Sequence, residues 1–163
     1  PDPEDRVASS GAHGFVVDIC AVEIDRATGV VTVTDYASVH DAGTLLNPLL
    51  ADGQVRGGFA HGVGAALFER HAYDDEGNLV TASLVDYVTP TAPDLPALVV
   101  DHLESPSPFT ALGAKGLGEG ATMSAPVAIA NAVADALGVD DLELPLTAPR
   151  VWELLNRPGG NEE

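Results

Sequence analysis

A glycine-rich run holds the residues of this chain that are best suited to chemistry. Residues 114–120 read AKGLGEG and place one carboxylate, Glu119, among three glycines directly before a segment of helical pattern. Because the glycines at 116, 118 and 120 lack Cβ atoms, the backbone can take positive φ values and approach a bulky ligand. A helix that begins there offers free N–H groups to an anion. A Glu enclosed in a partly dry loop tends to have a raised pKa, which suits a general base. The run therefore predicts a ligand cradle with a built-in base.

The same residues also fit a purely structural role. Glycine-rich turns between a strand and a helix are common, and a Glu just before a helix complements the helix dipole. Two phosphate-binding signatures are absent, since the run is not GxGxxG and Lys115 is followed by no Ser or Thr. From these residues alone, ligand binding and a structural role at the start of a helix both remain open.

Other polar clusters give weaker signals. His40 and Asp41 could form a metal pair or an acid/base dyad, but their place at the end of a strand pattern favours ordinary capping. The acidic run 74–76 lacks alternating calcium ligands, and the scattered histidines lack zinc spacing. Neither Ser105 nor Ser107 lies in a nucleophile elbow. We therefore predict no metal-ligating side chains in this chain.

Strand patterns occur in four places. Residues 13–25 and 30–40 alternate apolar and polar side chains on either side of a turn that contains Gly29, which predicts a β-hairpin. Residues 79–88 and 99–104 are also of strand composition, and the first of them runs into a proline-rich loop.

Helical patterns alternate with the later strands. The first predicted helix begins at Asn47, a good N-cap, and runs to about Arg70. Its five glycines indicate close packing against another backbone or a ligand, because each is costly in an exposed helix. The second runs over residues 124–137, directly after the glycine-rich run. The last covers residues 148–155, where Trp152 is expected to dock the helix onto the body.

Length and charge limit the class of protein. The 163 residues suit a single α+β domain, with a frayed tail expected over residues 157–163. The net charge of −18, from 25 acidic and 7 basic residues, argues against nucleic acid and anionic membrane surfaces as partners. No apolar stretch approaches the length of a membrane span.

Cysteine usage and the first residue bear on the compartment. The single Cys20 excludes an internal disulfide and any zinc or iron–sulfur site built from several cysteines of this chain. The sequence opens on Pro1 with no signal-peptide pattern, so a mature, trimmed or excised chain is expected. These features predict a cytoplasmic, reducing setting.

Several motifs follow one another in a specific order. After the hairpin come Asp41–Gly43 (DAG), Asn47 with Pro48, the glycine-rich helix with Gln54, and residues 115–119 (KGLGE). This succession closely resembles the C-terminal part of the molybdenum-binding large subunit of the xanthine dehydrogenase, aldehyde oxidase and aerobic carbon monoxide dehydrogenase family. The resemblance covers most of the chain, and it is specific because several motifs recur in order.

The resemblance implies a molybdenum hydroxylase and the fold of its cofactor-binding domain, a β-hairpin and mixed strands packed with glycine-rich helices. In that family the Glu at the position of Glu119 is the general base that deprotonates a hydroxyl on molybdenum, whose oxygen then attacks an electron-poor carbon of a small molecule. Gln54 matches a glutamine that hydrogen-bonds near the pterin and the metal. The cofactor would be lined through the backbone of Lys115, Gly116, Leu117 and Gly118.

The resemblance also implies a cofactor form and partners. In bacterial members the pterin usually carries a cytosine nucleotide, so molybdopterin cytosine dinucleotide is expected. The segments that grip the pterin from the other side, the iron–sulfur clusters and the FAD site lie elsewhere in that family. We therefore expect this chain to act only with the remaining part of the large subunit and with iron–sulfur and flavin subunits.

A second interpretation belongs to a different class of function. The chain would then be a non-catalytic acidic interaction or structural domain that keeps the fold and binds no cofactor. The joint presence of Glu119 and the glycine-rich run favours the molybdenum hydroxylase, because neither feature is needed for folding.

Overall fold

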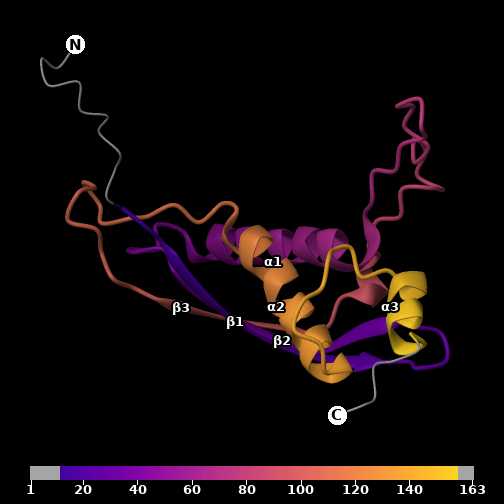
Figure 1. The fold of residues 1–163 in the computed structure, drawn as a ribbon. Helices are drawn as coiled ribbons and strands as arrows, with labels where there is room; N and C mark the ends of the chain where they lie inside the picture. Colours follow the sequence, from indigo (N-terminus) through magenta and orange to yellow (C-terminus); the bar gives the residue numbers. More distant parts are fainter. Residues whose placement is uncertain (1–11, 158–163) are drawn as a thin grey trace, which may run out of the picture.

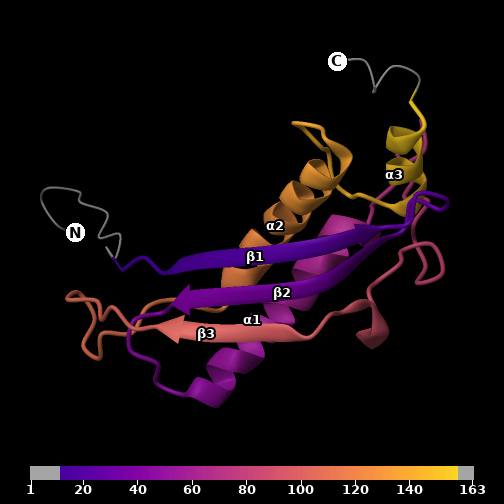
Figure 2. The ribbon, with the colours of Figure 1, turned by 90° about the horizontal axis from the view of Figure 1, so that it is seen from below.

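The computed structural model describes residues 12–157, in which a three-stranded sheet carries helices on one face (Figure 1). Strands β1 (Phe15–Ile24) and β2 (Val31–Asp41) form the predicted antiparallel hairpin. Strand β3 (Leu98–Leu103) pairs with β2 in parallel, which gives the order β1-β2-β3. Figure 2 shows the sheet in front and the helices behind it.

Two long helices cover the inner face of the sheet. Helix α1 (Pro48–Val63) begins as predicted, because the Asn47 side chain accepts a backbone N–H of its first turn, and it continues into the π-helical turn η1 (Gly64–Phe68). Helix α2 (Gly120–Leu137) crosses behind β1 and packs against α1. Within the described part of the chain, no helix is both long enough and apolar enough to cross a membrane.

The core lies between this inner face and the two helices. It is built from small aliphatic side chains, as the low aromatic content predicts, with one aromatic pair between Tyr36 of β2 and Phe59 of α1 at a centroid distance of 4.4 Å. The core residues with 0 or 1% exposure are Val55, Val63, Ala66, Ala125, Ile129, Val133, Leu146 and Val151.

The strand predicted over residues 79–88 is wrong. This segment holds one isolated bridge, between Tyr73 and Leu79, and a turn in which the Ser83 hydroxyl donates to Asp86. Side-chain bonding of this kind stabilises a turn in place of a strand. Val85 is 87% exposed, so its apolar side chain contributes nothing to the core.

The helix ends also differ from expectation. Helix α2 begins at Gly120, four residues before the predicted start, because the low helix propensity of glycine hides the first turn. Helix α3 (Ala148–Leu155) has the predicted bounds, but Val151 rather than Trp152 docks it: Val151 is fully buried and Trp152 is 46% exposed. Of the tail expected to fray, residues 158–163 lie outside the described residues.

The glycines of α1 fall into two groups. A Cβ atom at Gly62 would lie 2.6 Å from Cβ of Ala125 in α2, and one at Gly58 would also touch α2. At Gly53 and Gly57, by contrast, nothing lies within 4 Å of the Cβ position. The predicted close packing is confirmed for the first pair, whereas the second pair faces open space.

This division predicts opposite effects of one substitution in one helix. Gly62→Ala should lower the free energy of unfolding by about 1–3 kcal/mol, because the added methyl overpacks the contact with α2. Gly57→Ala should raise it by up to about 1 kcal/mol, because the helix gains propensity without a clash. Urea unfolding measures both variants, and equal effects would contradict the packing described.

Candidate functional site

The glycine-rich run lies at the end of the sheet where β2 finishes. Gly43 forms a bridge with Ala114, and the backbone N–H of Lys115 donates to the carbonyl of Ala42 at 2.8 Å. A pocket of about 300 Å³ opens beside the run. Its walls are residues 116–120 together with Phe15, His40, Asp41 and Met123.

Glu119 occupies the N-cap position of α2 but makes no capping hydrogen bond through its side chain. Its carboxylate lines the pocket and is exposed. We expected the loop to enclose Glu119 in a partly dry site. This expectation is wrong for the described residues, because they leave the Glu119 side chain exposed. Its carboxylate is available to a ligand in the pocket.

The backbone of the run is open in a different way from the one predicted. Gly116, Gly118 and Gly120 do not have positive φ values, so that expectation is wrong. Positive φ occurs instead at Gly29, Gly43, Gly77, Gly113 and Gly138. A Cβ at Gly116 would still meet nothing within 4 Å, and within residues 12–157 no backbone N–H of 116–119 donates to a backbone acceptor. The run thus presents unpaired donors on an unobstructed surface.

The structure brings Gln54 to the glycine-rich run, so two of the features named in the resemblance lie together. Its Nε2 donates to the carbonyl of Gly118 at 3.4 Å, across 64 residues of sequence. One turn further along both helices, the Thr122 hydroxyl donates to the carbonyl of Gly58 at 3.3 Å. The contact between α1 and α2 therefore places the Gln54 amide beside residues 116–119.

The Lys115 side chain is held within the protein. Its Nζ lies 3.2 Å from Oδ2 of Asp41 and 2.7 Å from Oγ of Ser105, whose hydroxyl also donates to Asp41. Both charged side chains are largely enclosed. Hydrogen bonds from Ser105 and from the Gly43 N–H hold the pKa of Asp41 well below its usual range. The capping role expected for Asp41 is confirmed, and the Lys115 ammonium is occupied by partners within this chain.

This ion pair predicts that the position of the run depends on Asp41. Asp41→Asn should lower the melting temperature by several degrees and speed hydrogen exchange over residues 113–118, because it leaves the Lys115 ammonium without its counter-charge. Asp75→Asn, in an exposed turn, is the matched control. Identical melting and exchange in the two variants would show that the pair does not hold the run.

A buried polar chain behind the run was not predicted. Nε2 of His40 lies 2.8 Å from Oγ of Ser38, and the Ser38 hydroxyl donates to Asp18. Because that hydroxyl has one proton, His40 donates through Nε2, and its Nδ1 is left as an acceptor beside Gly120. The sequence contains a signal for this chain: three polar residues occupy inward positions of the hairpin, with Asp18 paired to Ser38.

His40 gives the chain a pH-dependent stability. Burial lowers the pKa of His40 from 6.5, an effect that Asp18 opposes and His102 reinforces. Below pH 6.5 the unfolded chain therefore binds a proton that the folded chain does not, so stability falls as the pH drops. This contribution is at most about 1.4 kcal/mol between pH 6.5 and 5.5.

The matched variants are His40→Gln and His61→Gln. His40→Gln should reduce the loss of unfolding free energy between pH 7 and 5.5, whereas His61→Gln, at an exposed position, should leave it unchanged. Urea titrations at the two pH values measure the difference. An unchanged pH dependence in the His40 variant would contradict the assignment.

The fold is that of an α+β domain with a pocket beside the glycine-rich run, and comparison with known proteins identifies its family. The sequence family of the molybdopterin cofactor-binding domain matches residues 2–96, a region that includes Gln54 but not the glycine-rich run. The chain belongs to this family of molybdopterin cofactor-binding domains.

Relatives and solved structures agree with this assignment. The chain is 46% identical over 146 residues to the nicotine 6-hydroxylase large subunit of Paenarthrobacter nicotinovorans, covering 88% of this chain and 17% of the relative. It is 38% identical to the carbon monoxide dehydrogenase large chain of Hydrogenophaga pseudoflava, covering 88% and 18%. The crystal structure of quinoline 2-oxidoreductase from Pseudomonas putida 86 matches with a TM-score of 0.79 and 44% identity, covering 84% and 18%. The chain thus spans less than a fifth of each of these proteins, and the expected fold is confirmed.

The residues of this chain fit contact with one edge of a molybdopterin. The N–H groups of residues 116–119 suit the phosphate and ring acceptors of such a cofactor. The space at Gly116 admits a bulky group, and the Gln54 amide lies beside Gly118. Among residues 12–157, no three His, Cys, Asp or Glu side chains gather as metal ligands.

Proposed function

We propose that this chain forms one wall of the cofactor site in a molybdenum hydroxylase and supplies its general base, Glu119. One observation carries the proposal. Glu119, whose carboxylate makes no capping hydrogen bond, and the open glycine-rich run line the same pocket, in a chain of the molybdopterin cofactor-binding domain family. The relatives named above are large subunits of oxidoreductases, which favours catalysis over a purely structural domain. The chain would correspond to the C-terminal portion of such a subunit.

Each residue of the site has a distinct role in this proposal. The backbone of residues 115–118 and the amide of Gln54 would hold and orient the pterin. The bound molybdenum would supply the two-electron redox chemistry. The Glu119 carboxylate accepts the proton of the water-derived oxygen that is transferred to the substrate, as a general base. The Asp41–Lys115 ion pair fixes the run, so that Glu119 keeps its position.

The proposal extends to the rest of the enzyme. The cofactor would be molybdopterin cytosine dinucleotide, and the electrons would leave through iron–sulfur clusters and FAD on partner chains or domains. The substrate would be a small molecule, and the complex would work in the cytoplasm. The strong net negative charge supports partners other than nucleic acid.

The direct test changes Glu119 in the complex that contains this chain. Glu119→Gln should lower turnover at least about 100-fold, because the amide cannot accept a proton, while the molybdenum content stays unchanged. Turnover is measured by dye reduction with a panel of aldehydes and N-heteroaromatic compounds, and molybdenum by elemental analysis. Glu76→Gln, in an exposed turn, is the matched control and should keep full activity.

Two results would contradict the proposal. Near-normal turnover of the Glu119 variant would remove this residue as the base. A native complex without molybdenum would remove the cofactor site itself.

A further inference from the structure

The outer face of the sheet, opposite the helices, is largely apolar, and its apolar side chains are mostly exposed in the described part of the chain. In β1 the outward side chains include Phe15, Val17 and Ile19, which are 68%, 65% and 70% exposed. The register places Val39 beside Val17 and places Val99 beyond Ile19 across Ala37. Asp41 and Asp101 lie on the same face, next to Leu103. We call the following residues the outer apolar face: Phe15, Val17, Ile19, Val39, Val99 and Leu103.

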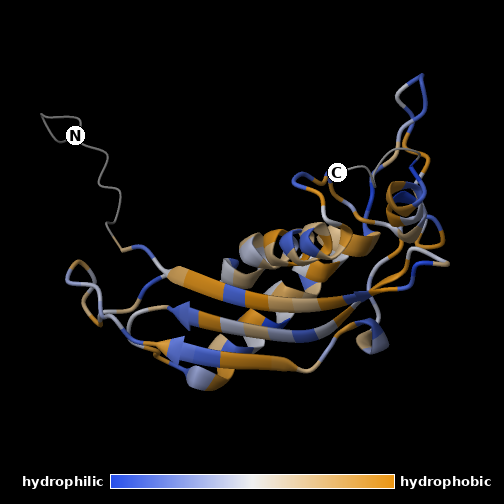
Figure 3. Ribbon diagram, turned by 60° about the horizontal axis from the view of Figure 1, so that its bottom comes forward, coloured by the Kyte–Doolittle hydropathy of each residue, from blue (hydrophilic) through white to orange (hydrophobic). Residues whose placement is uncertain are grey.

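Such a face is unusual for a sheet in water. A sheet covered on one side normally alternates apolar residues toward the core with polar residues toward solvent, whereas strands covered on both sides are apolar throughout. Figure 3 shows that hydrophobic residues dominate β1 and much of β3. Contiguous exposed apolar surface of this kind marks an interaction site.

The outer apolar face is continuous with the candidate site. Phe15 belongs to this face and also lines the pocket beside residues 116–120. Nζ of Lys115 lies 5.7 Å from the centroid of the Phe15 ring. Phe15, at one end of the face, is therefore next to the Asp41–Lys115 ion pair. A partner that covers the face therefore also reaches the open side of the pocket.

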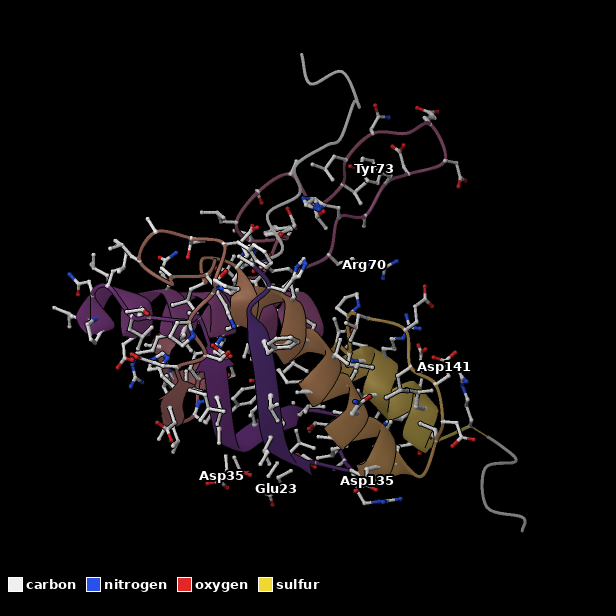
Figure 4. The ribbon with its side chains drawn as sticks, turned by 90° about the vertical axis from the view of Figure 1, so that its left-hand side faces the viewer. Glu23, Asp35, Arg70, Tyr73, Asp135 and Asp141 are labelled. Carbon is white, nitrogen blue, oxygen red and sulfur yellow. The ribbon has the colours of Figure 1, made fainter. Side chains whose placement is uncertain are left out.

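Charge and length argue for one kind of partner. A second copy would bring another net charge of −18 against this chain. The outer face itself carries the Asp101 carboxylate and the Asp41–Lys115 pair, with Glu23 and Asp35 at one end of the sheet (Figure 4). The matched large subunits extend far beyond this chain, which covers 17–18% of them. More than four fifths of such a subunit is thus available to cover the face.

We propose that the outer apolar face is the docking surface for the remaining part of the molybdenum-binding large subunit, which closes the open side of the pocket. The inference rests on the proposed function, because it takes the partner to be that subunit. It assigns the apolar side chains of β1 and β3 to an interface that the candidate site shares through Phe15.

Photo-cross-linking in the assembled complex identifies what covers the face. The photoreactive residue benzoylphenylalanine is placed at Phe15, at Leu103 or, as a control, at Tyr73, which is 62% exposed on the projecting loop (Figure 4). Mass spectrometry then maps the cross-linked peptides. The Phe15 and Leu103 probes should attach to large-subunit segments outside these 163 residues, and the Tyr73 probe should not reach the same segments.

Other products would overturn the proposal. These are attachment of the Phe15 and Leu103 probes to a second copy of this chain, attachment to an iron–sulfur or flavin chain, or no cross-link at all. The mapping works whether the rest of the subunit is a separate chain or part of the same polypeptide.

A pair of valine variants tests the same surface without a probe. Val17→Asp should lower the melting temperature of the assembled complex by several degrees, because a charge is buried in an apolar interface. Val85→Asp, on a side chain that is 87% exposed outside the face, should not. Equal melting of the two variants would contradict docking at β1.

Failure of this inference is separable from failure of the proposed function. Cross-links to the large subunit in a complex whose Glu119→Gln variant keeps its turnover would leave the docking surface and remove the base. Normal molybdenum content and loss of turnover in that variant, with the probes attached to another chain, would do the reverse.

Discussion

The site depends on the close approach of α1 and α2. Gln54, Gly58 and Gly62 follow one another at intervals of four along α1, so they lie on one face of the helix. They meet, in order, Gly118, Thr122 and Ala125, whose Cβ lies 2.6 Å from the Cβ position of Gly62. Larger side chains at the two glycines would separate the helices, and the Gln54 amide would lose its contact with the run. A packing constraint deep in the domain thus fixes a polar contact at its surface.

One of the few basic side chains of this chain has a structural position beside the candidate site. The chain has 7 basic residues against 25 acidic ones, and it places one of the few cations, Lys115, in an internal pair with Asp41. That ammonium is satisfied by its own partners, and among the described residues the backbone N–H groups of 116–119, which line the pocket, have no backbone acceptor. Backbone donors are fixed by the fold and carry no flexible side chain, which suits them to hold a cofactor in one orientation.

The features predicted correctly from the sequence are those with a local cause. The hairpin follows from alternation around Gly29, and the start of α1 follows from Asn47 and Pro48, whose capping needs only neighbouring residues. The errors lie where tertiary contacts or local side chains decide. Ser83 converts an apolar run into a turn, and Val151 docks α3 because the helix rotates it, rather than the larger Trp152, toward the core.

For the candidate site, the sequence singles out residues that the structure brings together, but it does not give their geometry. The order of motifs singles out Gln54 and residues 115–119. No sequence pattern indicates that the Asp18–Ser38–His40 chain lies beside Gly120 or that the Lys115 side chain pairs with Asp41. The Asp18–Ser38–His40 chain depends on the register between β1 and β2, and the Asp41–Lys115 pair joins β2 to a loop far along the sequence. The alternation that predicts the hairpin nevertheless contains part of the answer, since inward polar residues in a strand need buried partners.

The open side of the pocket follows from how the domain is built. Gly53 and Gly57 of α1 face open space near Gln54, and Phe15 is exposed on the other flank of the run, so the uncovered surfaces border the same residues. A general base works best where water is excluded and where fixed dipoles replace it. The described residues fix the position of Glu119 but do not enclose it. If Glu119 acts as the proposed base, its enclosure must come from whatever covers these flanks, so the environment of the carboxylate would be a property of the assembly.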